Sequence, residues 1–317
     1  MTENVIALLF PGQGSQAVGM GKDLAEKYPA ARHTFDEADE ALGYKLSTLC
    51  FEGPEDQLRL TEITQPAILT ASIAALRVIE TLMPKPSYVA GHSLGEYSAH
   101  VAAGTFSFAD AVRTVRNRGK YMQEAVPVGV GAMAAILGME AEKVAAVCQD
   151  AAQGEVCEPA NINSPEQVVI SGNTAAVERA AKLGAERGAK RAKLLPVSAP
   201  FHCSLMKPAQ DRLEGDLNKL TTQKPVYPVA CNVDAELVTD DLCARDTLVR
   251  QVTGSVKWDP CIRLLIAQGV QTFVEIGPGR VLCGLMRQID RSKICLNVSD
   301  DASLTKTLEA FAHVQKS

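Results

Sequence analysis

Runs of apolar residues alternate with helix-like stretches along most of the chain. Residues 5–10 are apolar throughout, which is typical of a strand covered on both faces. Apolar residues at helical spacing then predict helices at 23–41 and 66–83. A short β-prone run at 88–90 leads into two more predicted helices, at 94–103 and 109–125. Strands that alternate with helices predict a mostly parallel sheet with both faces covered.

Between residues 128 and 198 the pattern changes. The pattern predicts a strand at 132–137 and a helix at 141–152. Two strands at 156–161 and 167–171 then form a hairpin around Asn163-Ser164-Pro165, and a helix at 175–187 and a strand at 191–198 follow. This βαββαβ order is that of a ferredoxin-like unit, and about seventy residues suffice for such a domain. We therefore expect residues 128–198 to form a compact insert in an α/β domain made of residues 1–127 and 199–317.

After the insert, the alternation of helices and strands resumes. The pattern predicts helices at 205–220, 245–251, 259–268 and 280–289 and strands at 226–233, 270–276 and 294–298. Gly277-Pro278-Gly279 precedes the last of these helices, but no Walker lysine follows and the spacing is not that of a dinucleotide motif. A tight turn between strand and helix explains these glycines better than a phosphate cradle.

Composition narrows the class of protein. The chain has 317 residues, 46% of them hydrophobic, and a net charge of −5, which argues against nonspecific nucleic-acid binding. We see no basic leader and no apolar run long enough to span a bilayer, so we expect a cytoplasmic protein without a membrane contact. The nine cysteines are scattered, without C-x-x-C spacing. They are expected to be free thiols rather than disulfides or zinc ligands, and no metal site is expected.

Residues 91–95 read Gly-His-Ser-Leu-Gly and lie between the predicted strand at 88–90 and the helix at 94–103. A serine on such a tight turn projects its hydroxyl forward, near the free N–H groups of a helix N-terminus. The alternative is a glycine-rich turn with a solvated serine. The flanking strand and helix favour Ser93 as a nucleophile.

A serine nucleophile needs a base. Among the five histidines, His202 fits best because it follows a predicted strand, late in the chain, in the order found on hydrolase-like sheets. His33 and His313 lie in polar stretches, His100 lies within a helix, and His92 is expected to point away from its neighbour Ser93. No acidic residue between Ser93 and His202 stands out as the third member. A backbone or amide oxygen, or an acid hidden in the pattern, remains open.

Arg118 lies on the apolar stripe of the helix at 109–125, together with Val115 and Met122, whereas Arg113 and Arg116 do not. A guanidinium that faces inward is costly unless it meets an anion. One explanation is an internal ion pair. The other is a clamp for a substrate carboxylate, which favours an acyl donor with a free acid group.

Several motifs together resemble one family, the malonyl-CoA:acyl carrier protein transacylases of bacterial fatty-acid synthesis. They are Gly91-His92-Ser93-Leu94-Gly95-Glu96, Phe10-Pro11-Gly12-Gln13-Gly14-Ser15-Gln16, Arg118, Pro200-Phe201-His202, Asn163-Ser164-Pro165, Asn232-Val233-Asp234, Val256-Lys257-Trp258 and Glu275-Ile276-Gly277-Pro278-Gly279. The resemblance spans nearly the whole chain. It implies a hydrolase-like large domain with a ferredoxin-like insert, and a ping-pong transfer of malonyl from malonyl-CoA to holo acyl carrier protein without a cofactor. We expect a monomer.

The resemblance also implies a role for each matching residue. Ser93 would be the nucleophile, His202 its base, Gln251 the residue whose backbone carbonyl orients His202, Gln13 and Leu94 the oxyanion donors, and Arg118 the clamp, with His92 and Met122 beside the substrate. Gly254 departs from relatives with Asn-Pro in this loop, so any contact made there is in doubt. A serine hydrolase or thioesterase, and a non-catalytic docking module, are the alternatives. Acidic carriers would dock on basic residues such as Lys182, Lys190, Arg191 or Lys193.

Overall fold

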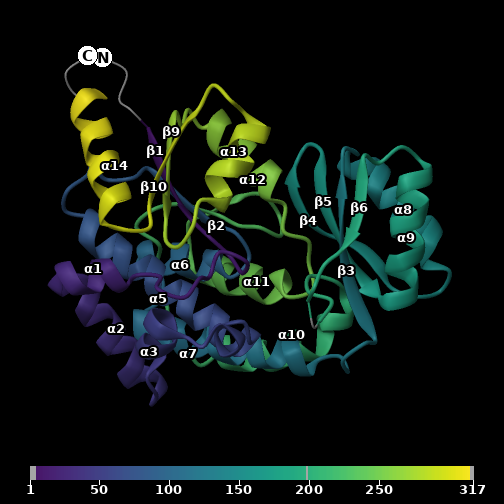
Figure 1. The fold of residues 1–317 in the computed structure, drawn as a ribbon, viewed down its shortest axis with the longest axis horizontal. Coiled ribbons are helices and arrows are strands. Elements are labelled where there is room, and N and C mark those ends of the chain that lie inside the picture. The colour runs from purple at the N-terminus through teal and green to yellow at the C-terminus, as the bar shows by residue number, and fades with distance from the viewer. Residues whose placement is uncertain (1–4, 198, 315–317) are drawn as a thin grey trace.

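The computed structural model describes residues 5–197 and 199–314 and contains two sheets (Figure 1). The larger sheet has six strands in the described part of the chain, in the order β10 (Ile294–Val298), β9 (Thr272–Ile276), β1 (Ile6–Phe10), β2 (Tyr88–Gly91), β7 (Val229–Ala230) and β8 (Leu237–Val238). Neighbouring strands from β10 to β7 are parallel, and β8 runs antiparallel to β7. The predicted mostly parallel sheet is confirmed, although the strand expected at 226–233 is only two residues long.

Strand β1 shows why its sequence lacks alternation. Ile6, Leu8 and Phe10 belong to a cluster of buried side chains that includes α5 (Thr61–Ile79) and α7 (Phe108–Glu124). Ala7 and Leu9 belong to another cluster, which includes α12 (Trp258–Ala267) and α13 (Val281–Ile289). Both faces of the strand are therefore covered, and each position must be apolar.

Helices surround this sheet. The N-terminal part contributes α1 (Lys22–Lys27), α2 (Pro29–Leu42), α3 (Leu46–Glu52), α4 (Glu55–Leu58), α5 (Thr61–Ile79), α6 (Gly95–Ala102) and α7 (Phe108–Glu124). The single helix predicted at 23–41 is two helices, because Pro29 at the first position of α2 cannot continue α1. Helix α5 is apolar and long enough to cross a membrane by length and composition, but 83% of that window is buried within the protein, as in a core helix.

The smaller sheet has the order β4 (Cys157–Ser164), β5 (Gln167–Asn173), β3 (Gly131–Leu137), β6 (Arg191–Leu194), and each neighbouring pair is antiparallel. Helices α8 (Ala141–Ala152) and α9 (Thr174–Glu186) cover its outer face (Figure 1). The sheet is tied to the rest of the chain by Val256, which exchanges backbone hydrogen bonds with Ala160 and Ile162 of β4. Residues 128–197 are thus packed against the layers of the larger sheet rather than tethered to them.

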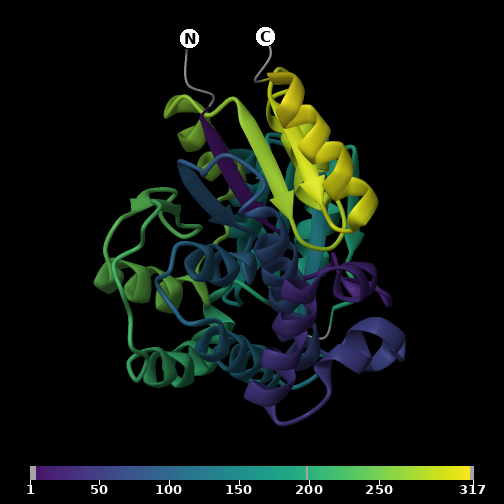
Figure 2. The same cartoon turned by 90° about the vertical axis from the view of Figure 1, so that its left-hand side faces the viewer.

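The C-terminal part adds the helices that complete the structure. They are the short 3-10 helix η1 (Ser204–Met206), α10 (Lys207–Leu217), α11 (Asp241–Gln251), α12 (Trp258–Ala267), α13 (Val281–Ile289) and α14 (Asp301–Val314). Helix α14, which the pattern did not predict, packs beside β10 at the edge of the larger sheet (Figure 2).

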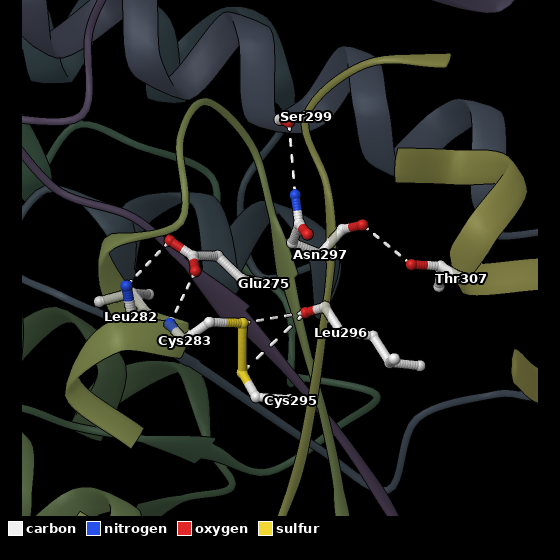
Figure 3. The surroundings of a disulfide bond; sticks show 8 residues. All are labelled: Glu275, Leu282, Cys283, Cys295, Leu296, Asn297, Ser299 and Thr307. Atoms are coloured by element: carbon white, nitrogen blue, oxygen red, sulfur yellow. Dashed lines mark hydrogen bonds between the residues drawn. A yellow bond between two sulfur atoms is a disulfide. The ribbon is translucent and has the colours of Figure 1, made fainter. Parts of the chain in front are cut away.

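Helix α13 and strand β10 are joined by a disulfide between Cys283 and Cys295 (Figure 3). The expectation that all cysteines are free thiols is wrong for this pair. The two residues are 12 apart in the sequence, but the helix folds back along its neighbouring strand and brings their Cα atoms to 5.5 Å, within the range that a disulfide spans. Spacing alone could not show this. The other seven cysteines are free.

Candidate active site

Ser93 lies on a sharp turn between β2 and α6. Its φ is +53°, a left-handed conformation that is unusual for a residue with a side chain. The glycines on either side make the turn possible: a Cβ on Gly95 would lie 2.1 Å from the carbonyl oxygen of Phe10, and one on Gly91 would lie 1.9 Å from the carbonyl of Gly95. The turn thus needs glycine at both positions. The strand, turn and helix expected around the serine are all present.

The structure brings His202 to Ser93 and fixes its tautomer. The Ser93 Oγ lies 2.7 Å from Nε2 of His202, and Nδ1 of the same ring lies 3.0 Å from the backbone carbonyl oxygen of Gln251. Because a carbonyl can only accept, Nδ1 carries the proton and Nε2 is free to accept the serine hydroxyl proton. Burial, with the positive charge of Arg118, lowers the pKa of His202 to about 3. The imidazole is therefore neutral and able to act as a base.

Gln251 supplies the group that orients His202, which the sequence left open because no acidic residue stood out. It is the last residue of α11 and is fully buried. Within the described residues, no carboxylate is hydrogen-bonded or ion-paired with His202, so the backbone carbonyl of Gln251 orients the ring. Serine and histidine form a dyad rather than a triad with an acid.

Arg118 points into the same site from α7 and is only 1% exposed. Its Nη1 donates to Oε1 of Gln65 at 2.8 Å, and its Nη2 donates to Ser93 Oγ at 3.1 Å and to Oε1 of Gln251 at 2.9 Å. In the part of the chain that the structure describes, no carboxylate forms an ion pair with it. The internal ion pair considered from the sequence is therefore absent from the described residues, and the guanidinium lies beside the nucleophile without a carboxylate in direct contact.

These side chains line a cleft of about 240 Å³ between the two sheets. Its walls are formed by Gly12, Gln13, Gln65, His92, Ser93, Arg118, Met122, Met133, Asn161, Asn163, Gln167, Val169, Leu195, Val197, Phe201, His202, Val281, Leu282 and Leu285. Gln13, His92 and Met122, to which the resemblance assigns roles, are among the residues that line the cleft. The ring of His92 contacts Trp258, and its Nε2 donates to Asn163 Oδ1 at 2.8 Å rather than to Ser93. Leu94 is buried behind Ser93, as the residue that precedes α6.

Three buried polar residues of the site, Gln65, Asn232 and Glu96, were given no role by the sequence, although the last two belong to the motifs that carry the resemblance. Gln65 holds Arg118, as described above. Asn232 braces the nucleophile turn, because its Oδ1 accepts the Ser93 N–H at 2.7 Å and its Nδ2 donates to the Gly91 carbonyl at 2.8 Å. Glu96 accepts from Asn232 N at 3.0 Å and from Gln251 Nε2 at 2.7 Å. The only available signal was the Ser-x-x-Glu spacing of residues 93–96, which predicts a helix cap instead.

The arrangement is that of an acyl-transfer site, and comparison with known proteins agrees. Residues 7–307 match the model of the acyl transferase domain family. The chain belongs to this family. It is 50% identical to the malonyl CoA-acyl carrier protein transacylase of Escherichia coli K12 over 96% of this chain and 98% of that one, and 50% identical to that of Bacillus subtilis over 96% and 97%.

Solved acyl transferase structures share the fold over nearly the whole length. An acyl carrier protein S-malonyltransferase from Vibrio cholerae is 51% identical, with a TM-score of 0.94 over 95% of this chain and 99% of that one. A malonyl-transacylase solved in complex with a type II polyketide acyl carrier protein is 47% identical, with a TM-score of 0.94 over 96% and 99%. The matched family region contains each residue of the site described above.

Gly254 lies in the loop after α11, at the position where the resemblance implies Asn-Pro in other members. A Cβ there would lie 2.7 Å from Cγ2 of Val233 and 2.9 Å from the carbonyl oxygen of Arg250. A side chain would therefore require these neighbours to shift. Within residues 5–197 and 199–314, no group of three or more His, Cys, Asp or Glu side chains could hold a metal ion.

Proposed function

We propose that the protein transfers a malonyl group from malonyl-CoA to the phosphopantetheine thiol of holo acyl carrier protein, through a malonyl ester on Ser93. The observation that carries the proposal is the unpaired, buried guanidinium of Arg118 within hydrogen-bonding distance of a serine that also bonds a neutral histidine. The histidine activates the serine hydroxyl as a nucleophile, and the guanidinium selects an acyl donor that ends in a carboxylate. The relatives' names and the carrier complex support the same reaction.

In the first half-reaction, Ser93 Oγ attacks the thioester carbonyl carbon while His202 Nε2 takes the hydroxyl proton. The tetrahedral oxyanion would be held by the backbone N–H groups of Gln13 and Leu94, each worth about 10²–10³ in rate when preorganised. Collapse breaks the carbon–sulfur bond, and the leaving coenzyme A thiolate takes the proton from His202. The second half-reaction reverses these steps with the carrier's thiol as nucleophile.

The acyl group would be selected by the guanidinium. Arg118 lines the cleft and is itself buried, and a malonyl carboxylate beside it could accept two parallel N–H bonds. An acetyl group leaves that charge unpaired in a site shielded from water, which costs binding energy. Met122 and His92 line the same space and would pack against the acyl chain.

We infer that residues 1–127 and 199–317 form a hydrolase-like domain and residues 128–198 a ferredoxin-like insert that covers the acyl-enzyme. The strand order β4-β5-β3-β6 and the βαββαβ sequence of elements support this description. A cover matters because water would otherwise hydrolyse the ester. The side chains of Ser93 and His202 and the backbone N–H donors suffice for the chemistry, so we propose no cofactor. We also expect the protein to be a cytoplasmic monomer.

A labelled-substrate experiment tests the reaction. The protein is mixed with radiolabelled malonyl-CoA and then with holo acyl carrier protein. The radiolabel is followed on a gel, and mass spectrometry identifies the residue that carries the malonyl group. Label should lodge on Ser93 and pass to the carrier, and Ser93→Ala should take up none. Rapid release of free malonate would support the alternative, a serine hydrolase or thioesterase. Absence of labelling would support a docking module.

A further inference from the structure

Glu96 is a second charged side chain buried in the site, and the reaction described above does not use it. It lies on α6, three residues after the nucleophile, and has no exposed surface. Its Oε2 accepts two hydrogen bonds, from the backbone N–H of Asn232 and from the side-chain amide of Gln251. Its Oε1 has no hydrogen-bond partner in the described structure. A buried carboxylate with one oxygen unsatisfied is costly and calls for a reason.

The amide of Gln251 separates this carboxylate from Arg118. Its Nε2 donates to Glu96 and its Oε1 accepts from Arg118 Nη2 at 2.9 Å. The orientation is forced, because a flipped amide would set two donors against each other at the guanidinium and two acceptors at the carboxylate. The two buried charges are thus linked through one side chain without touching.

The same network holds the catalytic dyad. Gln251 Nε2 also donates to the carbonyl of Ser93 at 3.0 Å, and its backbone carbonyl accepts from His202. Asn232 braces the nucleophile turn, and its own backbone N–H donates to Glu96. One carboxylate therefore anchors the residues that fix the serine turn, the base and the guanidinium.

Resting on the proposed function, we propose that Glu96 is a positioning residue that acts through Gln251: it balances the charge of Arg118 at a distance and so leaves the guanidinium free to pair with the substrate carboxylate. A direct salt bridge would stabilise Arg118 equally well but would compete with substrate. The intervening amide keeps the guanidinium aimed at Ser93. The negative charge of Glu96 also opposes the substrate's own, so it sets how tightly a malonyl group is held.

The charge of Glu96 should depend on pH near neutrality. Burial raises the pKa of Glu96 to about 7, against the opposing effects of its hydrogen bonds and of Arg118. The other titratable or charged groups that face it are Asp234, Cys231, Cys261 and Tyr97. Burial raises the pKa of both thiols and of the tyrosine, and Arg250 lowers that of Asp234. Glu96 is therefore the member of this cluster that titrates near neutral pH.

The charge of Glu96 determines whether malonyl-CoA binding strengthens or weakens as the pH rises. Above its pKa, Glu96 is ionised and repels a second carboxylate in the site. Below it, Glu96 is neutral and Arg118 attracts malonyl without opposition. The malonyl-CoA concentration that half-saturates acylation of Ser93 should thus rise as pH rises through about 7, by about tenfold, a usual size for coupling between two sites. Acetyl-CoA has no carboxylate, and its half-saturating concentration should not change.

Glu96→Gln tests the proposal in the whole protein. The amide retains an oxygen for Asn232 and Gln251 and places its NH₂ where Oε1 has no partner, so the fold should persist while the charge is lost. Acylation by malonyl-CoA and by acetyl-CoA is measured by rapid quench between about pH 6 and pH 8. In the variant, the half-saturating malonyl-CoA concentration should be low and independent of pH, with the maximal rate within a few fold of wild type.

Asp39→Asn is the matched control, because Asp39 is another buried carboxylate, on α2, that accepts from Ser47 outside the site. It should keep the wild-type pH dependence. If Glu96→Gln also keeps it, or slows malonyl and acetyl transfer equally, Glu96 is merely structural and the proposal fails. Wild-type protein that forms no malonyl-Ser93 at any pH would instead refute the proposed function, so the two failures are distinguishable.

Discussion

Arg118 is the residue on which acyl selectivity should depend most. Arg118→Ala removes a charge-assisted pair with the substrate carboxylate, so acylation by malonyl-CoA should lose about 10²–10³ in kcat/KM. Acylation by acetyl-CoA should instead stay level or rise, by less than about tenfold, because Ser93 and His202 remain and no buried charge is left unpaired beside the acetyl group. The acyl-enzyme mass after incubation with each coenzyme A ester measures both.

Arg113→Ala is the control for this loss. Arg113 lies on the same helix, but its side chain is 51% exposed and pairs with Asp110 at the surface, so neither substrate should be affected. Malonyl selectivity that survives Arg118→Ala would show that another group holds the carboxylate.

His202 predicts an unusual pH profile for the chemical step. Because burial and the charge of Arg118 lower its pKa to about 3, the imidazole stays neutral as the solution becomes more acidic. The maximal rate of Ser93 acylation at saturating substrate should therefore show no loss of a base between about pH 5 and pH 7, where an ordinary histidine would protonate. Rapid-quench rates across this range provide the measurement. An inflection of the acylation rate at about pH 6.5 would mean that the histidine is far better solvated than the structure shows.

At this scale, the sequence revealed the residues that break a local pattern and missed those that do not. Ser93 interrupts a strand and a helix with a glycine-flanked turn, and Arg118 interrupts an apolar stripe, so both stand out. Glu96, Gln65 and Asn232 are polar residues whose burial depends on which distant segments pack over them. No periodicity within their own segments shows that packing.

The disulfide between α13 and β10 is the element-scale feature with a measurable effect. It closes a loop whose ends are 12 residues apart, and a crosslink over a loop of that length restricts the unfolded chain by about 3 kcal/mol. Reduction should therefore lower the free energy of unfolding by about 2–3 kcal/mol, as seen in urea titrations with and without dithiothreitol. The double variant Cys283→Ala and Cys295→Ala should be less stable and indifferent to the reductant. A wild-type protein that does not respond to the reductant would show that the two thiols are free in solution.

The same helix also contributes to the cleft. Val281, Leu282 and Leu285 of α13 line the site, and the carboxylate of Glu275 on β9 accepts the N–H groups of Leu282 and Cys283 at the helix N-terminus (Figure 3). The disulfide and this carboxylate therefore fix one wall of the acyl-transfer site from two sides.

Elements with strong apolar periodicity were predicted well, and short or polar ones were not. Strand β1, helix α8 and the hairpin of β4 and β5 lie close to their predicted positions. Helix α5 begins at Thr61, five residues before the predicted start, because Pro66 is accommodated within it rather than at its first turn. Helices α3 and α4 are too short for periodicity to be measured, and their stability depends on packing against α2 and α5.

On the scale of the whole molecule, the site lies where the two sheets meet. The larger sheet supplies Ser93 at the end of β2, and the smaller sheet contributes Asn161, Asn163 and Val169 to the opposite wall. Neither sheet alone would enclose the acyl group. The carrier must therefore deliver its phosphopantetheine arm through the opening between them, and its docking surface should lie on the edges of that opening.

Basic residues on strand β6 are the best placed of those that the sequence suggested for carrier docking. Arg191 and Lys193 are exposed, have no ion pair in the described structure, and lie just before Leu195 and Val197, which line the cleft. Lys190 is engaged with Glu166 at 2.8 Å. The resemblance implies an acidic carrier, and Arg191 and Lys193 would attract such a carrier over a distance that shortens as the ionic strength rises.

Reversing both charges tests this surface. Arg191→Glu with Lys193→Glu should raise the carrier concentration for half-maximal transfer by about tenfold at low salt, with the difference shrinking as salt is added. Acylation of Ser93 by malonyl-CoA should stay unchanged, because neither residue contacts the dyad. Lys182→Glu, on α9 at the outer face of the smaller sheet, is the matched control and should behave as wild type. If the carrier dependence of the double variant equals that of wild type, the carrier docks elsewhere on the rim, and the electrostatic attraction must come from another part of the molecule.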